Sequence, residues 1–147
     1  LALFCDLVLM AEHARIGDPH VNAGIVAGDG GAILWPLLLG PHRGKEVLLL
    51  GDLMNSGDAE RLGLVNAVHA GPELAEAAEA VARRLATGPR VAIEFNKRLA
   101  NADILDRVNR LLDTSLALEA LTFETSDHRE AVKAFLEKRP AVFGKGS

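Results

Sequence analysis

Residues 17–31, which read GDPHVNAGIVAGDGG, constrain the fold more than any other stretch of the chain. They contain five glycines, two aspartates, a proline and a histidine. A regular helix or strand does not suit this mixture, because glycine raises the entropic cost of ordering the backbone and proline removes a hydrogen-bond donor. The segment therefore predicts an irregular backbone path that holds polar side chains at fixed points.

The glycines of this segment have two interpretations. A glycine cluster that leads into a helix offers unpaired backbone N–H groups, which can hold an anion, an oxyanion or a water. Gly28, Gly30 and Gly31 are the candidates for such a site, and a purely structural turn is the alternative. The segment lacks the Gly-Lys-Ser/Thr ending of a P-loop and the glycine spacing of a dinucleotide fingerprint.

His20 also has two interpretations, as a structural group or as a working acid or base. Asp18 and Asp29 lie near it in sequence, and a carboxylate can orient an imidazole. Asp18 and His20 would suit two ligands of a metal, but the sequence offers no third partner, so we expect no metal site. A G-x-S-x-G elbow is missing, which gives serine hydrolysis no support.

Composition excludes several classes of protein. The net charge of −4 over 147 residues argues against a nucleic-acid partner, which would require a basic face. The single cysteine excludes an internal disulfide and a cysteine-based zinc site, and it makes the cytoplasm the expected location. The longest apolar runs, Ile33–Leu39 and Val47–Leu50, are too short to span a bilayer, so no membrane partner is expected.

The first residues, LALFCDLVLM, read as a buried strand already in progress at residue 1. We therefore expect the chain to be the C-terminal part of a longer polypeptide. Strands are expected at Leu3–Ala11 and Arg15–Gly17 and within the alternating stretch 64–70.

Helices are expected over most of the remaining chain. The expected ranges are 30–39 (bent or begun at Pro36 and stopped by Gly40-Pro41), 42–50, 57–63 with Ser56 as N-cap, 73–86, 90–102, 105–124, and 128–139, where Asp127 caps and Glu130 completes a capping box. The apolar stripes of the later helices fit a core within one chain or contacts with a neighbouring subunit.

Three blocks of the sequence resemble the crotonase family, also called the enoyl-CoA hydratase/isomerase family. CDLVLMAEHARIGDPHVNAGIVAGDGGA (5–32) is similar to its Cys-Asp strand, its Ala-x-Phe-Gly-x-Pro-Glu turn and its Gly-Ile-x-Pro-Gly-x-Gly-Gly loop. GKEVLLLGDLMNSGDAERLGLVNAVHA (44–70) is similar to the block that ends in Gly-Leu-Val-Asn. FETSDHREAVKAFLEKRPAVF (123–143) resembles the closing helix, which ends in Glu-Lys-Arg.

The resemblance implies an α/β fold, the C-terminal part of a crotonase-like spiral of ββα units, followed by an all-helical oligomerisation tail. Residues 1–70 would belong to the spiral core and residues 71–147 to the tail, which builds homotrimers or dimers of trimers. It also implies an acyl-CoA thioester as substrate, a thioester enolate stabilised by two backbone N–H groups, and hydration of 2-enoyl-CoA. No cofactor is implied, since CoA is part of the substrate.

The family's functional residues fall on three positions. His20 stands where hydratases carry the second of two catalytic glutamates; the first would lie one position before Leu1. Gly28 matches a glycine whose N–H serves the oxyanion hole or the attacking water, and Lys138 matches a lysine that reaches the CoA phosphates of a neighbouring subunit. Asp29 lies one position after the place where dienoyl-CoA isomerases of the family carry a catalytic aspartate. Adjacent residues on an extended path point to opposite faces, so the resemblance does not assign a catalytic role to Asp29.

The histidine at position 20 leaves the chemistry open. An unperturbed histidine can act as acid or base near neutral pH, so His20 is either a catalytic group or a pocket-lining residue in a member with altered chemistry. The alternatives to hydration are therefore a double-bond isomerase or related enzyme, and an acyl-CoA binder without catalytic activity.

Overall fold

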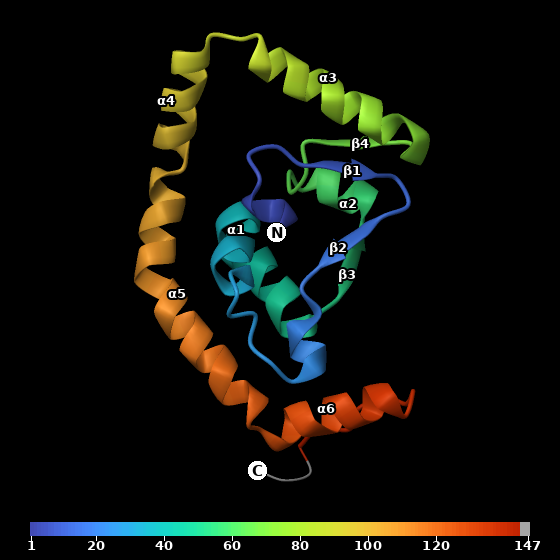
Figure 1. The fold of residues 1–147 in the computed structure, drawn as a ribbon. Coiled ribbons are helices and arrows are strands. Elements are labelled where there is room, and N and C mark those ends of the chain that lie inside the picture. The colour runs from blue at the N-terminus through green and yellow to red at the C-terminus, as the bar shows by residue number, and fades with distance from the viewer. Residues whose placement is uncertain (145–147) are drawn as a thin grey trace. The chain divides into compact units, whose positions relative to one another are not determined.

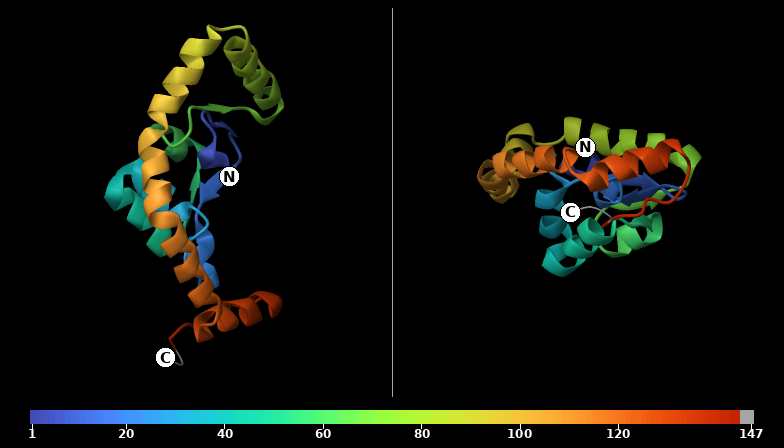
Figure 2. Two further views of the ribbon diagram at one scale, coloured as in Figure 1. Left: turned by 60° about the vertical axis from the view of Figure 1, so that its left-hand side comes forward. Right: turned by 90° about the horizontal axis from the view of Figure 1, so that it is seen from below.

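The computed structural model describes residues 1–144 (Figures 1 and 2). These residues divide into two compact units. The first holds Leu1–Ile16 and Met54–Asp106; the second holds Gly17–Leu53 and the chain from Arg107 onward. The boundaries of these units differ from the predicted division into a spiral core (1–70) and a helical tail (71–147), because each unit contains residues from both ranges. That division therefore stays a prediction. The elements in chain order are η1 (Ala2–Phe4), β1 (Leu9–Ala11), β2 (Arg15–Gly17), η2 (Pro19–Ala23), α1 (Gly31–Leu50), β3 (Leu53–Asn55), α2 (Ser56–Arg61), β4 (Ala67–His69), η3 (Gly71–Glu73), α3 (Leu74–Ala86), α4 (Arg90–Ala100), α5 (Ala102–Phe123) and α6 (Ser126–Leu136), where η marks a 3-10 helix.

A parallel pair of short strands organises the first unit. Strand β1 pairs with β4 in the register Leu9↔Ala67, Met10↔Val68 and Ala11↔His69, and helix α3 packs on both strands. Parallel strands require a long crossover, which here includes α2, itself packed on β4. The buried apolar residues of this unit are Met10, Ala59, Leu64 and Val65.

The expected strand at Leu3–Ala11 is wrong over most of its length. Residues Ala2–Phe4 form a 3-10 helix, and only Leu9–Ala11 is extended in a ladder. The pairing stops at Asn66, whose side-chain oxygen accepts from the N–H of Val8 at 2.7 Å and whose own N–H donates to the Val8 carbonyl at 2.8 Å. An apolar run forms a strand only where a neighbouring strand supplies its hydrogen bonds, and the ladder with β4 begins only at the pair Leu9↔Ala67.

Helix α1 of the second unit consists of two helical segments, as the glycine and proline pattern predicts. Its one non-helical residue is Gly40, with φ 76° and ψ 166°, a conformation that favours glycine. Pro36 lies inside the first segment and does not interrupt it. The first segment buries Ile33, Leu34 and Trp35, and these residues form the core beside the glycine-rich segment.

Two expected N-caps are wrong by one or two residues. Asn55, not Ser56, caps α2: its side chain accepts from the N–H of Asp58, while the Ser56 hydroxyl donates to the carbonyl of Glu12. Thr125, not Asp127, caps α6 by accepting from the N–H of His128. Both caps take the extended backbone that an N-cap needs, which sequence alone does not distinguish from the first helical residue.

The later helices form close to their expected ranges and leave apolar residues exposed. On α4, Val91, Phe95 and Leu99 recur every four residues, a spacing that places them on one face, and are 60%, 60% and 75% exposed. On α6, Phe135 and Leu136 are also exposed. No helix within residues 1–144 combines the length and the apolar character that a membrane crossing requires.

Candidate functional site

The glycine-rich segment folds as a 3-10 helix, a loop and a helix start, all within the second unit. Asp18 takes φ −131° and ψ 85°, outside the helical region that a following proline disfavours. Pro19 then begins η2, and Gly24 ends it in the left-handed conformation with φ 68°. The loop from Ile25 leads to α1, so the irregular path expected from the composition is present.

Asp18 is the centre of the polar contacts in this segment. Its side chain is 6% exposed, and both of its oxygens are used. Oδ1 lies 2.5 Å from Nδ1 of His20, and Oδ2 accepts a hydrogen bond from Nε1 of Trp35 at 2.8 Å. A buried carboxylate is costly unless it is hydrogen-bonded, and these two contacts provide the compensation.

His20 lies between two carboxylates. Its Nδ1 contacts Asp18, and its Nε2 lies 3.8 Å from Oδ1 of Asp29. The imidazole is 28% exposed, and Asp29, the residue that Nε2 faces, is 63% exposed, whereas Asp18, the residue that Nδ1 faces, is 6% exposed. The structure thus brings together the three residues that the sequence suggested could act together. A histidine held in this way can give or take a proton at Nε2.

Gly28 lies buried against helix α5. A Cβ at this position would lie 2.5 Å from the carbonyl oxygen of Ser115 and 2.7 Å from Oε2 of Glu119, so only glycine fits. The N–H of Gly28 donates to the carbonyl of Val26 at 2.8 Å. This N–H, which the resemblance assigns to substrate or water, therefore makes a hydrogen bond within the loop.

Glu119 is a residue that sequence reasoning missed. Its carboxylate lies at the glycine loop, as the distance to Gly28 shows, and its side chain is partly buried. The neighbouring Thr122 also reaches the loop, since its hydroxyl accepts from the N–H of Val26 at 3.2 Å. A glutamate on an amphipathic helix reads as a solvated residue in the sequence, and no motif marks it.

Lys138 lies outside helix α6, contrary to the expectation of a helix through Arg139. It has φ 52°, a left-handed conformation. Its N–H donates to the carbonyl of Phe135, and the N–H of Arg139 donates to that of Ala134. These bonds form a Schellman motif, in which glycine usually occupies the position of Lys138. The side chain is exposed.

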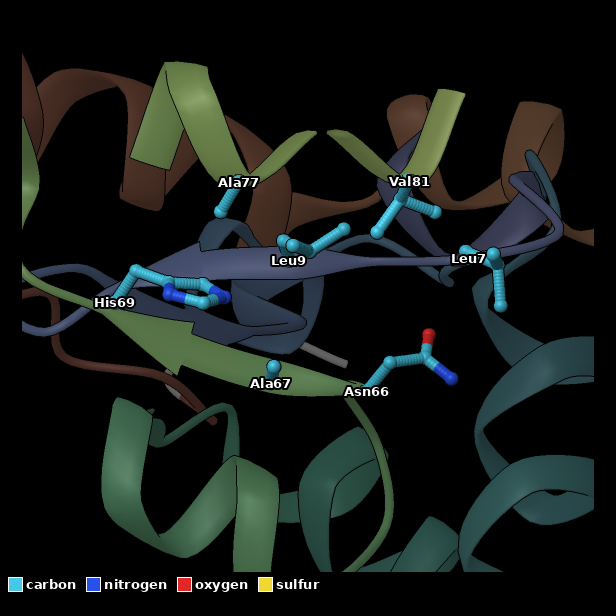
Figure 3. Close-up of a pocket in the computed structure, with 7 residues that line it drawn as sticks. All are labelled: Leu7, Leu9, Asn66, Ala67, His69, Ala77 and Val81. Atoms are coloured by element: carbon cyan, nitrogen blue, oxygen red, sulfur yellow. The ribbon is translucent and has the colours of Figure 1, made fainter. Parts of the chain in front are cut away.

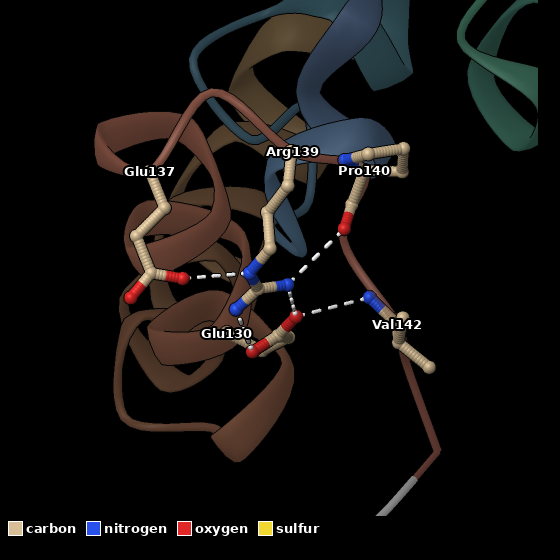
Figure 4. Close-up of polar contacts among 5 residues, drawn as sticks. All are labelled: Glu130, Glu137, Arg139, Pro140 and Val142. Carbon is tan, nitrogen blue, oxygen red and sulfur yellow. Dashed lines mark hydrogen bonds and ion pairs between the residues drawn. The ribbon is translucent and has the colours of Figure 1, made fainter.

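The chain beyond Lys138 is held by an ion pair (Figure 4). The guanidinium of Arg139 contacts both carboxylate oxygens of Glu130, at 2.5 and 3.1 Å, and its Nε donates to Glu137. The N–H of Val142 also donates to Glu130. The bonds from Arg139 and Val142 lower the pKa of Glu130 to about 2, and Glu130 raises the pKa of Arg139. Glu130 is thus an ion-pair residue rather than the capping-box residue expected.

The first unit contains a cavity of about 250 Å³ (Figure 3). It lies between the β1–β4 pair and α3, and its walls are mainly apolar; the lining residues are Leu7, Leu9, Asn66, Ala67, His69, Ala77 and Val81. Within residues 1–144 no group of three or more histidines, cysteines or carboxylates is arranged to hold a metal ion.

The chain is similar in structure to several solved proteins. Carnitinyl-CoA hydratase from Mycobacterium avium matches with a TM-score of 0.90 at 32% identity, over 97% of this chain and 56% of that one. A β-diketone hydrolase from Anabaena, bound to (S)-3-oxocyclohexyl acetic acid, matches with a TM-score of 0.78 at 36% identity, over 82% of this chain and 49% of that one. The crotonase-like α/β fold expected from the sequence is confirmed.

The sequence comparisons define the family. The profile of the enoyl-CoA hydratase/isomerase family matches residues 1–146. The crotonyl-CoA hydratase of Syntrophomonas wolfei is 36% identical over 143 residues, which is 97% of this chain and 55% of that protein. The chain therefore belongs to the enoyl-CoA hydratase/isomerase family, and it spans about half the length of the crotonyl-CoA hydratase.

Proposed function

We propose that the protein is an acyl-CoA enzyme that hydrates 2-enoyl-CoA, with His20 in the place of a catalytic glutamate of the family. The observation that carries the proposal is the partly exposed His20 imidazole, held by the buried Asp18 at Nδ1 while Nε2 faces the exposed Asp29. Family membership and the name of the crotonyl-CoA hydratase support the reaction class.

In the proposed reaction one O–H bond of water and the π bond between the α- and β-carbons break, the oxygen of water bonds to the β-carbon, and the α-carbon receives a proton in place of the one that water loses. The intermediate charge lies on the thioester oxygen, which backbone N–H groups would stabilise. His20 Nε2 would take a proton from the attacking water or give one to the α-carbon. Such a proton transfer contributes roughly 100- to 10,000-fold to the rate. Gly28 would donate to the thioester oxygen or to the water only by giving up its bond to Val26.

Lys138 is proposed to bind the phosphates of CoA. Its exposed ammonium offers a cation to an anionic group. Because the Schellman motif fixes the backbone at this residue, the direction in which the side chain leaves the protein is set by the fold.

A second candidate function is hydrolysis of a carbon–carbon bond in a β-diketone. The similarity to a β-diketone hydrolase and the histidine between Asp18 and Asp29 favour it. In this reaction water adds to one carbonyl carbon, the bond to the central carbon breaks, and that carbon takes up a proton. An open-chain diketone yields a carboxylic acid and a ketone, and a cyclic diketone yields one ring-opened molecule that carries both groups. His20 would remove the proton from water and return it to the carbon.

A substrate screen of the full-length protein separates the candidates. Hydration of a panel of 2-enoyl-CoA thioesters, followed by the loss of conjugated absorbance and by a product mass increased by one water, supports the first proposal. A shift of the double bond with no change in mass indicates a double-bond isomerase instead. Turnover of cyclic β-diketones without turnover of thioesters supports the second. Binding of CoA thioesters by calorimetry with no turnover of either class would contradict both and indicate a non-catalytic binder.

We further propose that the protein forms homotrimers or dimers of trimers. The exposed apolar row of Val91, Phe95 and Leu99 supports an interface, because large exposed apolar surfaces mark contact sites. Light scattering of the full-length protein should give three or six times the mass of one subunit, and a monomer would contradict the proposal.

A further inference from the structure

We propose that Trp35 is a positioning residue, whose indole fixes the carboxylate of Asp18 so that Asp18 sets the tautomer of His20. The effect on catalysis rests on the function proposed above, whereas the effect on the tautomer does not. Neither Trp35 nor Asp18 would touch the substrate, since both are buried, at 3% and 5% exposed.

The direction of each hydrogen bond follows from the chemistry of the groups. An indole N–H can only donate and an ionised carboxylate can only accept, so Oδ2 of Asp18 accepts from Trp35. The remaining oxygen, Oδ1, lies 2.5 Å from Nδ1 of His20 and must also accept. The proton of the neutral imidazole is therefore on Nδ1, and the lone pair is on Nε2.

The packing leaves the Asp18 carboxylate little room to turn. Gly31 lies so close that a Cβ there would be 2.0 Å from Oδ2 of Asp18. Trp35 follows Gly31 by four residues on α1, so both face the same side of the helix. One face of the first turns of α1 thus supplies both the N–H donor, from Trp35, and the space for the Asp18 carboxylate, which the missing Cβ of Gly31 leaves.

This arrangement prepares Nε2 for proton transfer. A free imidazole exchanges between two tautomers, and only the form protonated on Nδ1 presents a base at Nε2. Without the indole, the carboxylate would lose one of its two partners and could rotate away from the ring. Since hydrogen bonds to charged groups are among the stronger ones, we expect Trp35→Phe to lower kcat by about 10- to 100-fold with KM little changed.

Nitrogen NMR of the full-length protein labelled at histidine tests the tautomer without any substrate. Wild-type His20 should show the form protonated on Nδ1, and Trp35→Phe should show a mixture. Asp18→Asn should invert the preference, because the amide oxygen accepts from the indole and its NH₂ then faces Nδ1, which moves the ring proton to Nε2. His128, whose Nδ1 lies 2.8 Å from the carbonyl of Ala23, is the internal reference and should not change.

The outcomes separate the two proposals. A wild-type His20 protonated on Nε2, or unchanged His20 signals in Trp35→Phe, would overturn the role of Trp35 whatever the enzyme does. The expected tautomers in a protein that turns over no substrate would overturn only the proposed function. Circular dichroism checks that each variant is folded. If Trp35→Phe does not fold, Trp35→Leu, which also lacks the N–H donor, takes its place, because Asp18→Asn alone tests only the contact between Asp18 and His20.

Discussion

Replacement of Gly31 by alanine tests the packing around Asp18 most sharply. The added Cβ would lie 2.0 Å from Oδ2 of Asp18 and 2.9 Å from the Cβ of Ala27. Neither neighbour is the end of a long flexible side chain, and Oδ2 is also held by Trp35. The carboxylate must therefore move, and its hydrogen bond to the indole must lengthen or break.

The cost can be estimated from these contacts. Overpacking a filled site costs about 1–3 kcal/mol, and a weakened hydrogen bond to a buried charge adds about 1.5–3 kcal/mol when it is lost. Alanine in place of glycine in a helix returns about 1 kcal/mol. Together these contributions lower the free energy of unfolding of Gly31→Ala by roughly 1.5–5 kcal/mol.

Urea unfolding of the full-length protein measures this change, with an unchanged m value as evidence that the same transition is followed. Gly57→Ala is the matched control: it also adds a methyl group in the first turn of a helix, but the nearest atom, Oδ1 of Asn55, lies 3.5 Å away. The control should be neutral or stabilising by up to about 1 kcal/mol. Equal stabilities of Gly31→Ala and wild type would refute the packing described for Asp18.

Two further predictions concern the C-terminal segment. Because Arg139 lowers the pKa of Glu130 from 4.5 to about 2, the ion pair stabilises the fold above pH 4.5 and loses its effect as the pH falls toward 2. Urea unfolding from pH 6 to pH 2 should therefore show a shallower loss of stability for Glu130→Gln, and equal slopes would contradict this. Lys138→Gly should raise the free energy of unfolding by about 1 kcal/mol, since the left-handed conformation is costly for lysine. The same change should raise KM for CoA thioesters but not for pantetheine thioesters, which lack the CoA nucleotide. A change in KM for both classes would contradict a phosphate contact.

Much of the fold follows from local sequence signals. Gly40-Pro41 breaks α1 where the pattern predicts, and the amphipathic repeats locate the later helices to within a few residues. The strand at Leu3–Ala11 fails because a strand depends on its partner, and β4 begins only at Ala67. The cap of α6 moves to Thr125 because cap geometry depends on backbone angles, which are set by the packing of the chain.

The site was predictable only in part. The grouping of Asp18, His20 and Asp29 follows from their short separation in a loop that must turn. Trp35 reads as one more apolar residue of a buried helix, and only the structure shows its N–H at Asp18. Glu119 lies about 90 residues from Gly28 in sequence, and its approach to the glycine loop is a tertiary contact with no local signal.

The central claim is that His20 is the acid or base of the reaction, and its removal tests this directly. The measurement is kcat/KM of the full-length protein for the best thioester of the panel, before and after His20→Ala. His42→Ala, which removes an exposed imidazole elsewhere on the chain, is the matched control. The account predicts a loss of roughly 100- to 10,000-fold for His20→Ala and no change for His42→Ala. Equal values for wild type and His20→Ala would contradict it.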